Sequence, residues 1–158
     1  VVAVHVFHLI ADWTDALAEC ARVLKPGGAL LHCWNDRSAS AIGVLYDAWR
    51  QAVPEFHEQR PGIAFENNDV FALAQGWRAA PARIYTYPVM HTPAEFLQGH
   101  RERQFSGSWN LDDATVTRGV AAIEAAIAEH FPDPATPLES QSRFVVRPFL
   151  PPDGATGR

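Results

Sequence analysis

The sequence has few of the features that mark extracellular, membrane-spanning or nucleic-acid-binding proteins. It contains only two cysteines, Cys20 and Cys33, and both lie in apolar segments, where they are expected to be reduced core thiols. No apolar run approaches the roughly 18 residues of a membrane span, and no pattern of a signal peptide is present. Only one of the 13 basic residues is Lys, and the net charge is −5. We therefore expect a cytoplasmic protein with neither a membrane nor a nucleic-acid partner.

The composition is that of an ordinary globular chain. Apolar residues make up 47% of the 158 residues and charged residues 20%. These values allow a hydrophobic core, and the length predicts a single domain. No internal repeat or low-complexity segment interrupts the chain.

The clearest pattern lies between Asp12 and Asn35. Asp12 can cap a helix, and apolar residues then recur at the spacing of one buried helical face: Trp13, Leu17, Cys20, Ala21 and Leu24. The segment K-P-G-G at 25–28 is expected to end this helix, with its glycines as the C-cap. Residues 29–34 form an unbroken apolar run, which is typical of a strand covered on both faces. A helix, a glycine turn and a buried strand make up half of an α/β crossover unit.

The residue identities in this region resemble a known family. The run E-x-x-R-V-L-K-P-G-G followed by a hydrophobic strand, from Glu19 to Leu31, is similar to the late core of class I S-adenosylmethionine-dependent methyltransferases of the type 11 kind. Residues 1–10, which lead into Asp12 and Trp13, resemble the family's fourth strand and the loop that leaves it. The resemblance implies an α/β fold with a Rossmann-like methyltransferase sheet, S-adenosylmethionine as cofactor, and methyl transfer to a small-molecule acceptor.

The rest of the chain alternates between predicted helices and strands. Strands are expected at 1–7, 29–34, 83–90 and 142–149, and helices at 12–24, 39–53, 68–76, 92–103 and 112–130. Residues 55–66 have no clear period and are interpreted as a loop or lid. On the family's pattern these pieces resemble the fourth to seventh strands, with the last strand antiparallel. Residues 1–150 would then be the C-terminal part of a methyltransferase domain, with helices at 39–53 and 92–130 as insertions and 151–158 as a disordered tail.

The cofactor-binding signature of the family is missing from this pattern. In the family, the first strand ends in a glycine-rich loop, and an acidic residue after the second strand binds the ribose. Gly27 and Gly28 follow a helix rather than a strand, so they are not expected to form such a loop. Because the chain also starts within a run of strand residues, we expect a C-terminal fragment that is inactive alone and whose full-length parent carries the activity.

The resemblance nevertheless implies a set of site residues. The backbone around Val4, His5 and Val6 would lie beside the methionine part of the cofactor, and Phe7 and His8 would face the transfer site. His8 is a weak candidate for the catalytic base, because a histidine titrating near neutrality can accept a substrate proton. The alternative is that His5 and His8 are ordinary strand-end residues, since many methyl transfers need alignment rather than a base.

Aromatic residues supply further candidates for a substrate pocket. Trp34 ends a strand, which is the edge where ligands bind in α/β sheets, and Trp109 lies in a glycine-serine loop where an exposed ring would be unusual without a contact. Tyr87 and His91 are additional candidates. The alternative for each of these rings is a core position, where aromatic residues are more often found.

Two other classes of protein remain open. A non-catalytic α/β binding or interaction domain could use its sheet edge to pair with a partner chain, and a dehydrogenase half would share the α/β pattern. A homo-oligomer is also left open. No metal is expected, because histidines three residues apart on a strand, such as His5 and His8, point to opposite faces.

Overall fold

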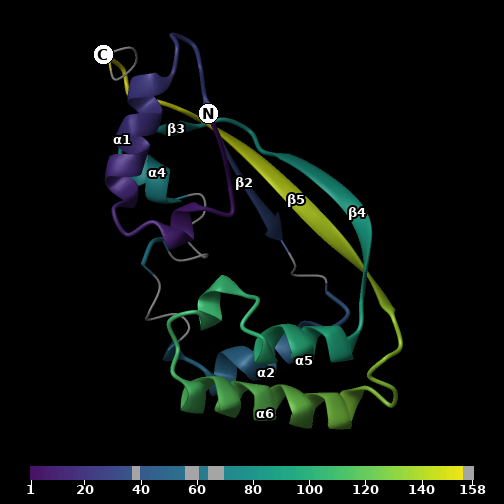
Figure 1. Ribbon diagram of the computed structural model, residues 1–158. Helices are drawn as coiled ribbons and strands as arrows, with labels where there is room; N and C mark the ends of the chain where they lie inside the picture. Colours follow the sequence, from purple (N-terminus) through teal and green to yellow (C-terminus); the bar gives the residue numbers. More distant parts are fainter. Residues whose placement is uncertain (37–39, 56–60, 64–69, 155–158) are drawn as a thin grey trace. The chain divides into compact units, whose positions relative to one another are not determined.

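The computed structural model describes residues 1–36, 40–55, 61–63 and 70–154 of a mixed α/β chain (Figure 1). The chain divides into two compact units. The first unit comprises Val1–Asp36, Arg60–Tyr85 and Arg143–Arg158, and the second comprises Arg37–Gln59 and Thr86–Ser142. Most of the loop expected at 55–66 (residues 56–60 and 64–66) and residues 155–158 of the expected tail lie outside the described residues.

Five strands form one sheet. They are β1 (Val2–Val4), β2 (Leu30–Asp36), β3 (Arg78–Ala79), β4 (Arg83–His91) and β5 (Leu138–Leu150). The order is β1-β2-β5-β3, and β4 also pairs with β5. β1 runs parallel to β2, whereas β5 runs antiparallel to both β2 and β3. The predicted sheet with an antiparallel last strand is therefore confirmed.

The core of the first unit forms around β2, which is paired on both edges. Leu30 at its start and Phe149 opposite it are fully buried. Helix α1 (Trp13–Val23) contributes the buried Leu17 and Ala21, and the short helix α4 (Val70–Ala74) contributes Phe71. The predicted buried face of α1 is therefore confirmed. Burial of these side chains removes apolar surface from water and is the main term that stabilises this unit.

The end of α1 differs from the prediction. The helix ends at Val23, with Leu24 as an extended C-cap, before the K-P-G-G segment begins. The Gly28 N–H donates to the Lys25 carbonyl over 2.8 Å, and Gly27 has φ +76°. A proline followed by a glycine with positive φ inside such a hydrogen bond forms a type II β-turn. The prediction of a glycine C-cap was wrong, because proline restricts the residue before it and ends the helix earlier.

The first strand is shorter than the predicted 1–7. β1 ends at Val4 because His5 has φ +48°, a left-handed conformation that an extended strand cannot contain. A 3-10 turn, η1 (Phe7–Leu9), follows. Gly62 lies against this turn so closely that an added Cβ would overlap the Phe7 carbonyl oxygen. Only glycine fits this approach, which places residues 61–63 directly beside the end of β1.

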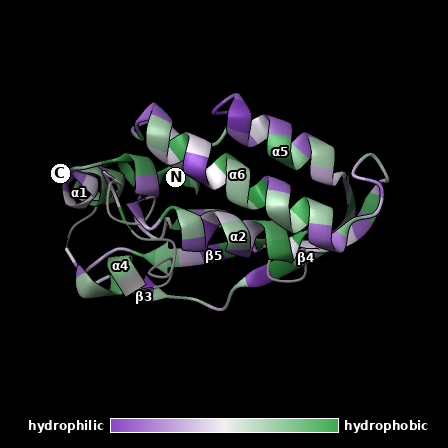
Figure 2. Ribbon diagram, turned by 90° about the horizontal axis from the view of Figure 1, so that it is seen from below, coloured by the Kyte–Doolittle hydropathy of each residue, from purple (hydrophilic) through white to green (hydrophobic). Residues whose placement is uncertain are grey.

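The second unit is built from three amphipathic helices, α2 (Gly43–Ala52), α5 (Pro93–Arg101) and α6 (Asp113–His130). In Figure 2, α5 and α6 each carry hydrophobic and hydrophilic residues. Their apolar faces meet in a core that contains Leu45, Trp49, Phe96 and Ile123. The predicted helices are thus confirmed with shorter bounds. α5 starts with the predicted capping box, in which Thr92 and Glu95 each accept a backbone N–H of the other.

Two smaller points complete the description of the helices. On α4, Ala72 is buried and Ala74 is exposed. None of the helices described has the length and apolar character that a membrane crossing requires.

Candidate functional site

The carboxyl ends of β1 and β2 form the candidate site. The two strands are parallel, with Val4 opposite Cys33, so both end at the same edge of the sheet. In open α/β sheets ligands bind beyond the carboxyl ends of the strands. The residues that reach this edge are His5 and Val6 after β1, and Asn35 and Asp36 at the end of β2.

His5 joins the two strand ends. Its backbone N–H donates to the Cys33 carbonyl over 3.1 Å. Its Nε2 accepts the backbone N–H of Asn35 over 3.1 Å. A ring nitrogen that accepts a hydrogen bond carries no proton, so this contact selects the neutral imidazole with its proton on Nδ1. His5 has a left-handed backbone conformation, with φ +48°, and its ring contacts the backbone of β2.

Asn35 carries an unusual polar atom at the same edge. Its Oδ1 is buried and has no hydrogen-bond partner among the described residues. Nearly all buried carbonyl-type oxygens in proteins are paired, and an unpaired one costs free energy. Such an atom calls for a partner, and a bound molecule is one that the chain itself does not supply. Asn35 is therefore a candidate site residue that the sequence analysis did not single out.

The charge at this edge is partly balanced. Asp36 lies opposite Arg143 on β5, and Arg143 Nη1 contacts Asp36 Oδ2 at 3.1 Å. The pair is partly exposed, so it adds little to stability. The carboxylate next to Asn35 is therefore already paired with an arginine.

The site residues predicted around the end of β1 differ in how far they are exposed. Val4 is 47% exposed, and His8 is half-buried with its carbonyl accepting the Gly62 N–H. Phe7 is only 2% exposed, and its ring packs in the core against Phe71 at 4.9 Å. The expectation that Phe7 faces a substrate is not supported by this position, because almost none of its side chain reaches solvent. The roles predicted for Val4, His5, Val6 and His8 stay predictions.

Trp34 lies near the end of β2 in the first unit. It is half-buried, and its ring centroid lies 5.1 Å from that of the buried His32. Trp34 is thus partly a core residue, and its remaining surface is at the candidate edge.

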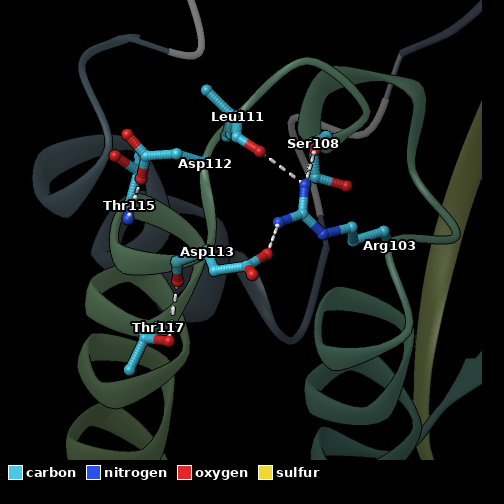
Figure 3. Close-up of polar contacts among 7 residues, drawn as sticks. All are labelled: Arg103, Ser108, Leu111, Asp112, Asp113, Thr115 and Thr117. Atoms are coloured by element: carbon cyan, nitrogen blue, oxygen red, sulfur yellow. Dashed lines mark hydrogen bonds and ion pairs between the residues drawn. The ribbon is translucent and has the colours of Figure 1, made fainter.

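Trp109 belongs to the second unit, as do Tyr87 and His91. Its indole is 59% exposed, and its Nε1–H donates to the Arg103 carbonyl over 3.0 Å. The loop that holds it is fixed by the Arg103 guanidinium. As Figure 3 shows, that group donates to the Ser108 carbonyl over 2.9 Å and the Leu111 carbonyl over 2.6 Å, and it pairs with Asp113.

Helix α6 starts next to this loop. Asp112 caps it by accepting the Thr115 N–H over 2.7 Å, and these hydrogen bonds hold the pKa of the Asp112 carboxyl below its usual value. Figure 3 shows the cap beside the Arg103 contacts. The exposed Trp109 ring is therefore presented by an ordered loop.

A second buried polar cluster was missed by the sequence reasoning. His100 on α5 is 5% exposed, its ring lies 4.1 Å from that of Trp49, and its Nδ1 has no partner among the described residues. Burial lowers the pKa of His100 to about 4, so the ring is neutral at physiological pH. A histidine within an apolar helical face is the only signal that could have revealed it.

The glycines bear on whether S-adenosylmethionine fits. Gly27 and Gly28 precede β2, so they lie at its amino end, away from His5 and Asn35. Within the described ranges no glycine-rich turn follows the carboxyl end of β1 or β2. The unpaired Asn35 oxygen does fit a ligand with a hydrogen-bond donor. The chain can therefore contribute one wall of a cofactor site.

Metal-binding residues do not gather in the part of the chain that is described, where no group of three or more His, Cys, Asp or Glu residues is arranged to hold an ion. Cys20 and Cys33 are free thiols, and burial raises the pKa of both. Neither has the lowered pKa of a reactive cysteine.

Comparison with known proteins adds a sequence match at the candidate edge. Residues 1–32, which include β1, η1, α1 and the start of β2, match the family model of a methyltransferase domain. The resemblance to methyltransferases is confirmed over this segment. The match supports methyl transfer in general terms. A comparison with curated proteins gave no match.

A solved structure from Bacillus halodurans, described as that of a candidate methyltransferase, is similar in outline. Its sequence is 13% identical, the alignment covers 95% of this chain and 68% of that one, and the TM-score is 0.48. The fold class therefore rests on the strand order and directions described above.

Proposed function

We propose that this chain is the C-terminal part of a class I methyltransferase that transfers a methyl group from S-adenosylmethionine to a small-molecule acceptor. The observation that carries the proposal is the family match over residues 1–32, which covers the parallel strand that ends at the candidate edge. The free thiols of Cys20 and Cys33 agree with a cytoplasmic setting.

In this proposal the chain binds and orients rather than reacts. S-adenosylmethionine supplies a sulfonium methyl group that is already activated toward a nucleophile. The backbone from Val4 to Val6 would lie beside the methionine part, and His5 would hold the two strand ends in register. Alignment of donor and acceptor then supplies much of the acceleration. His8, half-buried beside Gly62, is the candidate to accept a proton from the acceptor.

Calorimetric titration of S-adenosylhomocysteine tests the proposal. We expect micromolar binding to the full-length gene product that contains this chain, because that protein would supply the glycine-rich loop. We expect no measurable binding to residues 1–158 alone. Absence of binding to both proteins would contradict the proposal.

A non-catalytic interaction domain is the second candidate function. The observation that favours it is the outer edge of β1, where Val2 is 64% and Val4 47% exposed. No strand among the described residues pairs with this edge. A partner strand could bind there by completing the sheet. Binding of a partner without any binding of S-adenosylhomocysteine would support this candidate.

A further inference from the structure

Asn35 carries the strongest unexplained feature of the first unit. Its Oδ1 is buried and has no hydrogen-bond partner among the described residues, although its backbone is held firmly. The Asn35 N–H donates to His5 Nε2, and Asn35 is in register with Phe144 on β5. The backbone of Asn35 is thus fixed at the carboxyl edge of the sheet, while the side-chain acceptor Oδ1 has no partner among the described residues.

The chemistry of the missing partner follows from the atom. An amide oxygen only accepts hydrogen bonds, so the partner must be an N–H or O–H donor. Hydrogen bonds with a charged donor are roughly twice as strong as neutral ones. The nearest carboxylate in sequence, Asp36, is already paired with Arg143. We therefore expect a cationic donor at this edge to bind the uncharged Oδ1 of Asn35.

We propose that Asn35 Oδ1 accepts a hydrogen bond from the α-ammonium group of the cofactor's methionine part, and that His5 is the positioning residue that sets the Asn35 backbone. This inference rests on the proposed function, because it assumes that S-adenosylmethionine binds at this edge. It adds a side-chain contact from the strand that follows α1. That contact recognises the amino-acid part of the ligand and not its nucleoside part.

Two substitutions of Asn35 separate this contact from general damage. Asn35→Leu keeps the size of the side chain but removes the acceptor, and Asn35→Asp keeps an acceptor oxygen. The probes are S-adenosylhomocysteine and 5′-methylthioadenosine, which lacks the amino-acid part. Affinities are measured by calorimetry on the full-length gene product that contains this chain.

We expect Asn35→Leu to weaken S-adenosylhomocysteine about 10-fold or more, as loss of a hydrogen bond to a charged group does. The affinity for 5′-methylthioadenosine should change less than about twofold, because the proposed contact of Asn35 is with the amino-acid part, which this probe lacks. Asn35→Asp should retain the affinity for S-adenosylhomocysteine. Equal weakening of both probes, or no weakening of either, would overturn the inference.

The stability of the ligand-free protein gives an independent readout. Since Oδ1 is unpaired without ligand, Asn35→Leu should leave Tm unchanged or raise it. A clear fall in Tm would mean that Oδ1 already has a partner, which would also overturn the inference. If the wild-type protein binds neither probe, the proposed function itself fails. If the wild-type protein binds both probes and Asn35→Leu changes neither affinity, only this inference fails.

Discussion

At the scale of residues, two buried polar atoms without a hydrogen-bond partner say most about the site and the stability of this chain. Asn35 Oδ1 and His100 Nδ1 are both buried and unpaired among the described residues. They lie in different units, and only the first is at an edge where ligands bind. His100 is instead enclosed by aromatic rings, with Phe96 and Phe105 each 4.6 Å away between ring centroids. Its effect should therefore appear in stability.

His100 predicts a loss of stability in mild acid. Burial lowers its pKa from the ordinary value of 6.5 to about 4 in the folded protein, so the unfolded chain binds more protons between these values. The stabilising contribution is complete above pH 6.5 and is lost as pH falls toward 4. Between pH 7 and pH 5 we expect the free energy of unfolding to fall by about 2 kcal/mol from this group. Urea unfolding at the two pH values measures it.

The control for this prediction is His100→Phe, which keeps an aromatic ring in the cluster and removes the titrating group. Between pH 7 and pH 5, the free energy of unfolding of the variant should fall by about 2 kcal/mol less than that of the wild type. If both proteins lose the same free energy, His100 is not the group responsible.

At the scale of elements, the close crossing of α2 and α6 depends on one glycine. A Cβ at Gly119 would overlap ring carbons of Trp49 and a methyl group of Val53. Gly119→Ala should therefore lower the free energy of unfolding by about 1–3 kcal/mol through overpacking. Gly43→Ala is the matched control, because a Cβ at Gly43 has no neighbour within 4 Å. That variant should be neutral or slightly more stable. A neutral Gly119→Ala would contradict the prediction.

Sequence periodicity predicted the elements well wherever side-chain burial follows the local pattern. The helix at 112–130 was predicted within one residue of α6, because Asp112 is a strong N-cap and the apolar spacing is regular. The ends of β1 and α1 were missed. Both depend on backbone conformations, the left-handed His5 and the turn at Gly27, and not on hydropathy.

The candidate site was likewise predicted only where the signal is local in the sequence. The sequence placed Val4, His5 and Val6 at a strand end through resemblance to a family. It did not reveal that His5 Nε2 would bond to the backbone of a residue 30 positions away. It also placed Phe7 at the transfer site, where only tertiary packing against Phe71 shows it to be buried. Contacts between distant segments carry no local signal.

For the whole molecule, the exposed outer edge of β1 is the feature that bears on association. Val2 and Val4 are exposed on one face of this edge, whereas Ala3 is 7% exposed and faces the core. We expect residues 1–158 to self-associate through this edge, because unpaired apolar strand edges pair with other chains. The double substitution Val2→Lys, Val4→Lys should shift the protein toward monomer in analytical ultracentrifugation.

Val23→Lys is the control for this prediction. Val23 is 55% exposed and belongs to α1, not to β1. The substitution adds the same kind of charge, but it should leave the association state unchanged. If the control is as effective as the double variant, the β1 edge is not the surface that associates.

The order in which a ribosome makes this chain does not match the order of its strands. β2 is complete at Asp36, but the antiparallel partner on its inner edge is β5, whose paired residues begin at Arg143. The nascent chain must therefore carry β2 half-paired while more than a hundred residues are added. Pairing between such distant segments is slow and exposes the strand to wrong partners. Premature termination before Arg143 would leave that edge open, whatever helices had already formed.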